Sequence, residues 1–145
     1  MDVVESIADT AASWTLCFHR TSSMWWARYI GTYKHVSAYA YIPGEKLWLF
    51  YEVSTQPTSI IVVRDGAHID LLAKFIRDAD LVAMQRNPAA PMRYRRRLAL
   101  TCVSAVRDLI GLDSGALLPG RLYRDCLAAG GETFGRRAEI SGTAA

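Results

Sequence analysis

The chain has 145 residues, of which 51% are hydrophobic and 21% are charged, and its formal net charge is +3. This length fits one compact domain, and the apolar fraction excludes wholesale disorder. No apolar run approaches the roughly 20 residues that span a bilayer, and the N-terminal stretch lacks the basic and apolar regions of a secretory signal. The small positive charge is not sufficient to indicate a nucleic-acid ligand.

The three cysteines, Cys17, Cys102 and Cys126, lie far apart, with no Cys-x-x-Cys motif and no Cys/His pair at zinc spacing. A disulfide framework, a structural zinc site and a bound cofactor are therefore not expected. We predict a soluble domain of a reducing compartment, cytoplasmic in the cell that produces it. Cys17 lies in a predicted strand and Cys126 in a predicted helix, and both are interpreted as buried packing residues.

Segments rich in aromatic and β-branched residues predict an initial strand, a hairpin of two strands, and two further strands, the last of them short. In chain order they cover residues 14–19, 33–42 with 47–53, 60–64 and 80–85. The segment 43–46 supplies the turn of the hairpin. With the tightest turn, Pro43 pairs with Lys46, and further along the hairpin Ser37 pairs with Glu52.

Apolar residues that recur every three or four positions predict amphipathic helices. These cover residues 68–79, 101–112 and 121–128, and a short helix is expected in the first dozen residues. Together the elements predict an α+β fold, in which a central antiparallel β-sheet packs against the helix that carries Cys102. We divide the chain into an N-terminal segment (1–13), a single domain (14–129) and a loosely ordered C-terminal tail (130–145).

Cys102 follows Thr101 at the predicted first turn of its helix. Threonine is a favourable N-cap, so the sulfur would lie near unpaired backbone N–H groups and the positive end of the helix dipole. That environment lowers the pKa of a thiol and favours a nucleophilic thiolate, and the same N–H groups can hold an oxyanion. The alternative is that Cys102 is a packing residue, because cysteine often behaves as a small hydrophobe.

His35 lies on the odd-numbered face of the first hairpin strand, where a histidine is more often a core residue than a base. If it is a base, its second nitrogen needs an acceptor that orients the ring. The predicted register makes Glu52, a carboxylate in an otherwise apolar strand, its diagonal neighbour. A nucleophile, a base and an orienting carboxylate are therefore geometrically feasible as Cys102, His35 and Glu52. His19 ends the first strand, where it is expected to be solvated unless that strand borders the hairpin and His19 lines the same cleft.

Three segments occur in a characteristic order: KHVSAYA, then WLFYEVS, then TCVSAVRDLIGL followed by LLPGRLYRDCL. This order resembles that of the circularly permuted papain-like cysteine hydrolases of the NlpC type, in which the histidine strands precede the cysteine helix. The chain is most similar to the small forms encoded by phages and by bacteria with prophage-like elements. The resemblance covers roughly residues 14–128 and implies a permuted papain-like fold.

The resemblance implies that Cys102 is the nucleophile, His35 the general base and Glu52 the polar residue that orients the imidazole. Aspartate, histidine, asparagine or glutamine is as usual in the family at the third position. Members of the family cleave amide bonds in peptidoglycan peptides, in proteins or in acyl-amide substrates, through an acyl-thioester intermediate. We therefore expect a phage-associated cysteine peptidase or amidase with a peptide or peptidoglycan-like substrate.

The alternative function is that of a structural or assembly component of a phage virion, in its tail or neck, that uses the same fold without catalysis. The paired aromatic residues Trp25 and Trp26 and the basic tract Arg93–Arg97 would then contact phage structural proteins. The simplest interpretation of the tract is a solvated basic stretch. A nucleic-acid-binding module built on the tract is a third hypothesis.

Overall fold

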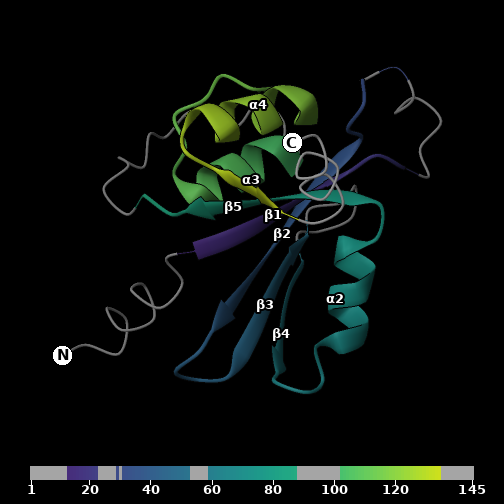
Figure 1. Cartoon of the computed structure of the whole chain (residues 1–145), viewed down its shortest axis with the longest axis vertical. Helices are drawn as coiled ribbons and strands as arrows, with labels where there is room; N and C mark the ends of the chain where they lie inside the picture. Colours follow the sequence, from purple (N-terminus) through teal and green to yellow (C-terminus); the bar gives the residue numbers. More distant parts are fainter. Residues whose placement is uncertain (1–12, 23–28, 30, 53–58, 88–101, 135–145) are drawn as a thin grey trace, which may run out of the picture.

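The computed structural model describes residues 13–22, 29, 31–52, 59–87 and 102–134 of the chain. The described strands are β1 (Ser13–His19), β2 (His35–Ile42), β3 (Leu47–Glu52), β4 (Ser59–Arg64), β5 (Ala79–Gln85) and β6 (Glu132–Phe134), and the described helices are α2 (Ile69–Ile76), α3 (Cys102–Ile110) and α4 (Pro119–Ala128) (Figure 1). None of these helices is long and apolar enough to cross a membrane. The predicted N-terminal helix, Trp25 and Trp26, and the basic tract Arg93–Arg97 lie outside the described residues.

The six described strands form one antiparallel sheet in the order β4-β3-β2-β1-β5-β6. The predicted α+β class with a central antiparallel sheet is therefore confirmed. The hairpin of β2 and β3 also has the predicted register, because Ile42 pairs with Leu47 and Ala38 with Tyr51. The turn is closed by the Lys46 amide, which donates to the Pro43 carbonyl at 3.3 Å.

Side chains alternate between the two faces of the sheet, and both faces are covered. Even-numbered residues of β1, β2 and β5 pack on the face that carries α3 and α4, whereas Cys17 and Leu81 pack on the face that carries α2. Figure 1 shows α3 and α4 lying together, apart from α2. A strand buried on both faces reads as a nearly continuous apolar run, which explains the sequence of β1.

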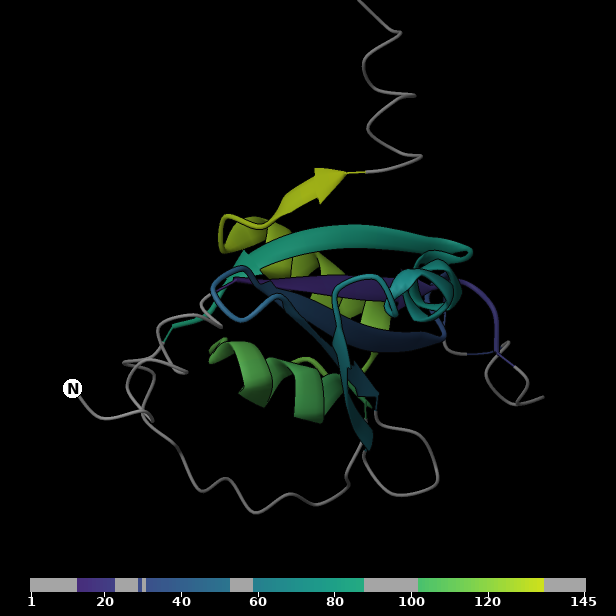
Figure 2. The same ribbon diagram turned by 90° about the horizontal axis from the view of Figure 1, so that it is seen from below.

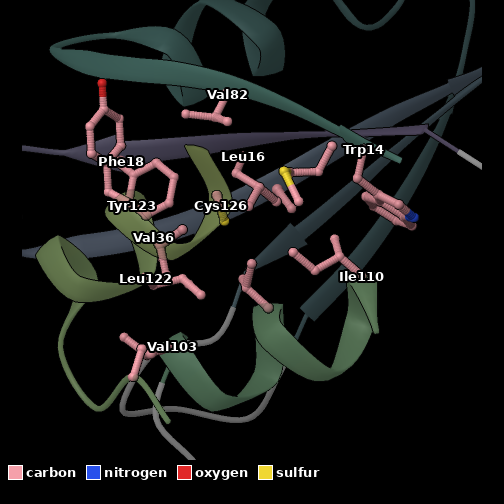
Figure 3. Close-up of a cluster of buried hydrophobic side chains, with 14 of the residues drawn as sticks. Trp14, Leu16, Phe18, Val36, Val82, Val103, Ile110, Leu122, Tyr123 and Cys126 are labelled. Carbon is pink, nitrogen blue, oxygen red and sulfur yellow. The ribbon is translucent and has the colours of Figure 1, made fainter. Parts of the chain in front are cut away.

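The larger core lies between the sheet and the pair formed by α3 and α4 (Figure 3). Its fully buried members include Leu16, Phe18, Val36 and Val82 from the strands and Val103, Val106, Ile110, Leu122 and Cys126 from the helices. The Phe18 ring meets the Tyr123 ring of α4 edge-on, with the ring centroids 5.2 Å apart. Burying one large apolar side chain contributes roughly 1.5–3 kcal/mol, and this core buries more such side chains than the core under α2.

The smaller core lies under α2. Phe75 of α2 meets the fully buried Phe50 of β3 edge-on, with ring centroids 5.0 Å apart. Trp48 of β3 stacks on His68, the residue before α2, at a centroid distance of 4.2 Å. The helix predicted over 68–79 ends earlier, at Ile76, because Asp78 has a left-handed φ of 52° and β5 begins at the next residue.

Local sequence explains the ends of α3 and α4. α3 begins at Cys102, within a residue of the prediction, and Gly111 follows its last residue with a φ of 66°. α4 begins at Pro119, two residues before the predicted start. Proline suits a first helical position because its φ is preset and its missing N–H is not needed there. Between the helices, the Ser114 hydroxyl donates to the carboxylate of Asp125 in α4.

The sheet continues beyond residue 129, where the predicted domain ends. β6 pairs with β5 at one edge of the sheet (Figure 2), so residues 132–134 are not loosely ordered, and the rest of the predicted tail lies outside the described residues. Gly131 allows the backbone to pass close to the core between α4 and β6. A Cβ there would lie 2.7 Å from Met84 Sδ and 2.8 Å from the Cys126 carbonyl oxygen. The glycines that predicted a loose tail instead permit a close approach of the backbone to the core.

Leu122→Ala tests the larger core. Leu122 is fully buried, and leucine-to-alanine truncations in cores lower the free energy of unfolding by about 2–5 kcal/mol, because apolar contact is lost and a cavity remains. We expect a loss in that range in urea denaturation followed by circular dichroism. Leu117→Ala is the matched control, since Leu117 is 81% exposed, and should change the free energy by less than about 0.5 kcal/mol. Equal losses in the two variants would contradict the packing of α4.

Candidate functional site

The structure brings together two of the three predicted site residues, His35 and Glu52. His35 is the first residue of β2, and Glu52 is the last residue of β3. His35 Nε2 lies 3.8 Å from Glu52 Oε1, in agreement with the diagonal relation that the hairpin register predicts. This distance is longer than a hydrogen bond, so Glu52 acts on the imidazole through its charge.

The surroundings of His35 favour the neutral form of its imidazole. Burial lowers the pKa of His35 below its usual value of 6.5, and the nearby Glu52 carboxylate opposes that shift. His35 Nε2 is buried and has no hydrogen-bond partner within the described part of the chain. At neutral pH the side chain is therefore an uncharged imidazole, which is the form that can accept a proton.

His19 joins this pair from the neighbouring strand. It is the direct cross-strand partner of His35, and the two rings stack with centroids 5.7 Å apart and planes at 26°. His19 Nε2 lies at hydrogen-bond distance, 2.8 Å, from Ser37 Oγ. His19 is half-buried and not fully solvated, because β1 borders the hairpin. This is the arrangement under which the sequence places His19 near the hairpin histidine.

Cys102 approaches β2 from the other side of the sheet. It is half-buried and packs against the larger core, on the face that carries α3 and α4. The backbone amides of Val36, Val103 and Cys102 itself lie near its sulfur. Because Val36 directly follows His35, the thiol reaches the strand one residue from the histidine. Within the described residues no hydrogen bond joins the thiol to the His35 ring.

Burial and the start of α3 act on the Cys102 thiol in opposite directions. Burial raises the pKa of the thiol, and the amides of Val36, Val103 and Cys102 only partly oppose that rise. The lowered pKa expected from a helix start is therefore not found, because the cost of a buried charge outweighs the favourable amides. At neutral pH Cys102 is a thiol, and a base must remove its proton before it can act as a nucleophile.

The other two cysteines are packing residues, as predicted. Cys17 and Cys126 are fully buried and form no disulfide. Burial raises the pKa of each thiol to about 12, and at Cys17 the neighbouring Ser37 hydroxyl partly opposes the rise. Neither thiol is therefore available for chemistry in the folded protein.

Ser37 is the residue of this cluster to which sequence reasoning assigned no role. It is only 1% exposed, yet its hydroxyl is paired with His19 across the strands. The available signal was a serine in the middle of the strand HVSAYAYI, at a position that the strand period buries together with His35. A buried hydroxyl needs a hydrogen-bond partner, and the partner lies on β1, which the hairpin register alone does not locate.

Known proteins offer no further guide to this site. No protein-family model matches the chain, and neither a curated protein nor a solved structure matches it significantly. Across the described segments, no group of three or more His, Cys, Asp or Glu side chains is arranged to hold a metal ion.

Iodoacetamide labelling followed by peptide mass spectrometry tests the three thiol environments. In the folded protein at about pH 8 we expect Cys102 to be labelled first, because it is half-buried whereas Cys17 and Cys126 are fully buried. Labelling in urea is the control and should make the three rates similar. Faster labelling of Cys17 or Cys126 than of Cys102 in the folded protein would contradict the structure.

The two histidines make stability depend on pH. Because burial lowers the pKa of both below 6.5, the unfolded chain binds protons at these positions more readily than the folded chain does. Their contribution is therefore present above pH 6.5 and is lost as the pH falls below that value. We expect the urea midpoint to fall between about pH 7 and pH 5, and to fall less in the double variant His19→Gln, His35→Gln. A double variant with the full wild-type pH dependence would exclude this linkage.

Proposed function

We propose that the protein is a cysteine hydrolase with a permuted papain-like fold, which cleaves an amide bond through an acyl-thioester on Cys102. The observation that carries the proposal is that Cys102 and the His35–Glu52 pair meet neighbouring residues of β2, from its opposite faces. The Cys102 sulfur lies by the amide of Val36, the next residue along from His35, and His35 Nε2 faces Glu52 at 3.8 Å. Nucleophile, base and orienting acid are the three parts that such a reaction needs.

In the first half-reaction, His35 accepts the thiol proton as the Cys102 sulfur attacks the carbonyl carbon of the scissile amide. Because the thiol and the imidazole approach β2 from opposite faces in the unliganded structure, this transfer requires that substrate binding bring the two groups into contact at the start of β2. The imidazolium then gives its proton to the leaving nitrogen. The C–N bond breaks, an amine departs, and the acyl group remains on the sulfur as a thioester.

In the second half-reaction, a water molecule hydrolyses the thioester. His35 takes a proton from the water as its oxygen adds to the thioester carbon, the C–S bond breaks, and the proton returns to the sulfur of Cys102. The products are a carboxylic acid and the regenerated thiol. Glu52 favours the tautomer that carries its proton on Nε2, which leaves Nδ1 to exchange protons with the thiol and the water.

The start of α3 provides donors for the negative charge that develops on the substrate oxygen. The first N–H groups of a helix have no partner within the helix, and the amides of Cys102 and Val103 lie near the sulfur. Fixed N–H groups aimed at a developing oxyanion lower the barrier without reorganisation. Their proximity to the nucleophile supports acyl transfer over the use of Cys102 as a simple packing residue.

The substrate class that we propose is a peptide or peptidoglycan-like amide, with the protein acting in association with a phage. This part rests on the resemblance of the segments KHVSAYA, WLFYEVS and TCVSAVRDLIGL to the NlpC-type hydrolases. A location in the cytoplasm of the producing cell, or in the virion, belongs to the same proposal. The support from the His35–Glu52 pair and from Cys102 at the start of α3 concerns amide hydrolysis in general and does not depend on the phage association.

The second candidate is a virion component that uses this fold as a scaffold. It is favoured by the edge strand β4, which pairs with β3 on one side. Ile60 and Val62 of β4 are 65% and 54% exposed, and exposed apolar side chains on an edge strand are typical of a contact with another chain. This candidate requires no proton transfer between His35 and Cys102, so the two functions are separable by experiment.

Digestion of purified peptidoglycan, with mass spectrometry of the released peptides, tests the hydrolase. We expect Cys102→Ala to abolish release, and His35→Gln to lower the rate by about 100-fold or more, because a general base contributes that much. Glu52→Gln should lower the rate less, since it alters only the orientation and the charge near the base. Cys126→Ala is the matched control and should keep the rate within about twofold. Wild-type turnover by Cys102→Ala would refute the proposal.

The rate at which a peptide that carries a chloromethyl ketone alkylates Cys102 gives a test that needs no turnover. If His35 removes the thiol proton once a peptide occupies the site, His35→Gln should slow this alkylation about tenfold at neutral pH. Cys126→Ala again serves as the control. An unchanged alkylation rate, together with no release of peptides by the wild-type protein, would favour the scaffold.

A further inference from the structure

We infer that His19 is a positioning residue for His35: its ring, held by Ser37, stacks on the proposed catalytic imidazole and fixes its orientation. The inference rests on the proposed function, because it concerns the base of that reaction. It assigns a role to a histidine on β1, an element that carries none of the three residues Cys102, His35 and Glu52.

The contacts of His19 form a short chain across β1 and β2. His19 and His35 are direct cross-strand partners, and their rings stack at 5.7 Å and 26°. His19 Nε2 is bonded to Ser37 Oγ at 2.8 Å, and Ser37 is 1% exposed and lies two residues along β2 from His35, on the same face. The strand that carries the base therefore also carries the group that anchors its stacking partner.

His35 needs such a support because no hydrogen bond holds its Nε2. That atom is buried without a partner, and Glu52 Oε1 at 3.8 Å is too far away to accept a hydrogen bond. A charge at this distance favours one protonation state but sets the plane of the ring only weakly. The flat face of His19, fixed by its own hydrogen bond, supplies the missing constraint through packing.

The charges around the stack keep His19 from competing for the catalytic proton. Burial lowers the pKa of His19 and the adjacent His35 lowers it further, whereas the backbone of Arg77 and the carboxylates of Glu52 and Asp78 oppose these shifts. Two imidazoles in contact do not both become charged at neutral pH. When His35 becomes an imidazolium during the reaction, His19 therefore stays neutral and contributes only packing against the His35 ring.

The test follows the His35 imidazole in the full-length protein by long-range proton–nitrogen NMR across a pH titration. We expect the wild type to show one tautomer with a titration midpoint below 6.5. His19→Gln keeps a group that can bond Ser37 but removes the ring, so it should give mixed tautomers and a midpoint moved upward, because water reaches His35. His19→Phe keeps the stacked face and should preserve the single tautomer. Identical His35 signals in the wild type and in His19→Gln would overturn the inference.

Kinetics separate this inference from the proposed function. If the wild type is active, His19→Gln should lower kcat about tenfold and change KM by less than about twofold. It should also move the acid limb of the pH profile to higher pH. His19→Phe should recover most of the lost kcat. Urea denaturation of each variant identifies any loss of folding. If His19→Gln does not fold, the His35 NMR signal of His19→Phe still tests the inference. A tautomer change in His19→Gln without turnover in the wild type supports the positioning of His35 and overturns the hydrolase. Normal kcat in a folded His19→Gln overturns the positioning role.

Discussion

The pairing of β1 with β2 is the constraint on which the rest of the structure depends. β1 lies between β2 and β5, and its register places Cys17 opposite Ser37 and His19 opposite His35. Because side chains alternate along a strand, a slip of one residue would turn the histidines to the other face and expel Phe18 from the core. The burial of the core therefore holds the histidines in register.

The thiol and the histidines depend on opposite faces of the same strand. Val36 contributes its side chain to the larger core and its amide to the Cys102 sulfur, while His35 belongs to the other face. Packing that stabilises α3 against the sheet also removes water from the sulfur and raises its pKa. The fold thus places a protonated thiol and a neutral imidazole at neighbouring residues of β2, on opposite faces of the strand. In the proposed reaction the proton transfer belongs to the substrate complex, since no thiolate–imidazolium pair is preformed.

Local features were predictable from the sequence, and features that need distant contacts were not. The hairpin register follows from one four-residue turn, so the position of Glu52 relative to His35 could be predicted. The start of α3 at Cys102 could be predicted from the apolar period of the helix. The place of β1 beside β2, and therefore the position of His19 next to His35, depends on which distant segments meet. The Cys102 pKa was misjudged for the same reason, since the helix start is a local effect and burial is a property of the whole fold.

The close packing of the backbone at Gly131 determines where the chain can be truncated or fused to another protein. The Gly131 amide donates to the Cys126 carbonyl at 2.9 Å, and a Cβ at this position would clash with Met84 and Val82, so the chain turns back along the sheet as it leaves α4. A truncation at residue 129 would strip β6 from β5 and open a new sheet edge, even though the glycines there resemble a linker. A tag or fusion partner attached beyond Phe134 leaves that edge covered.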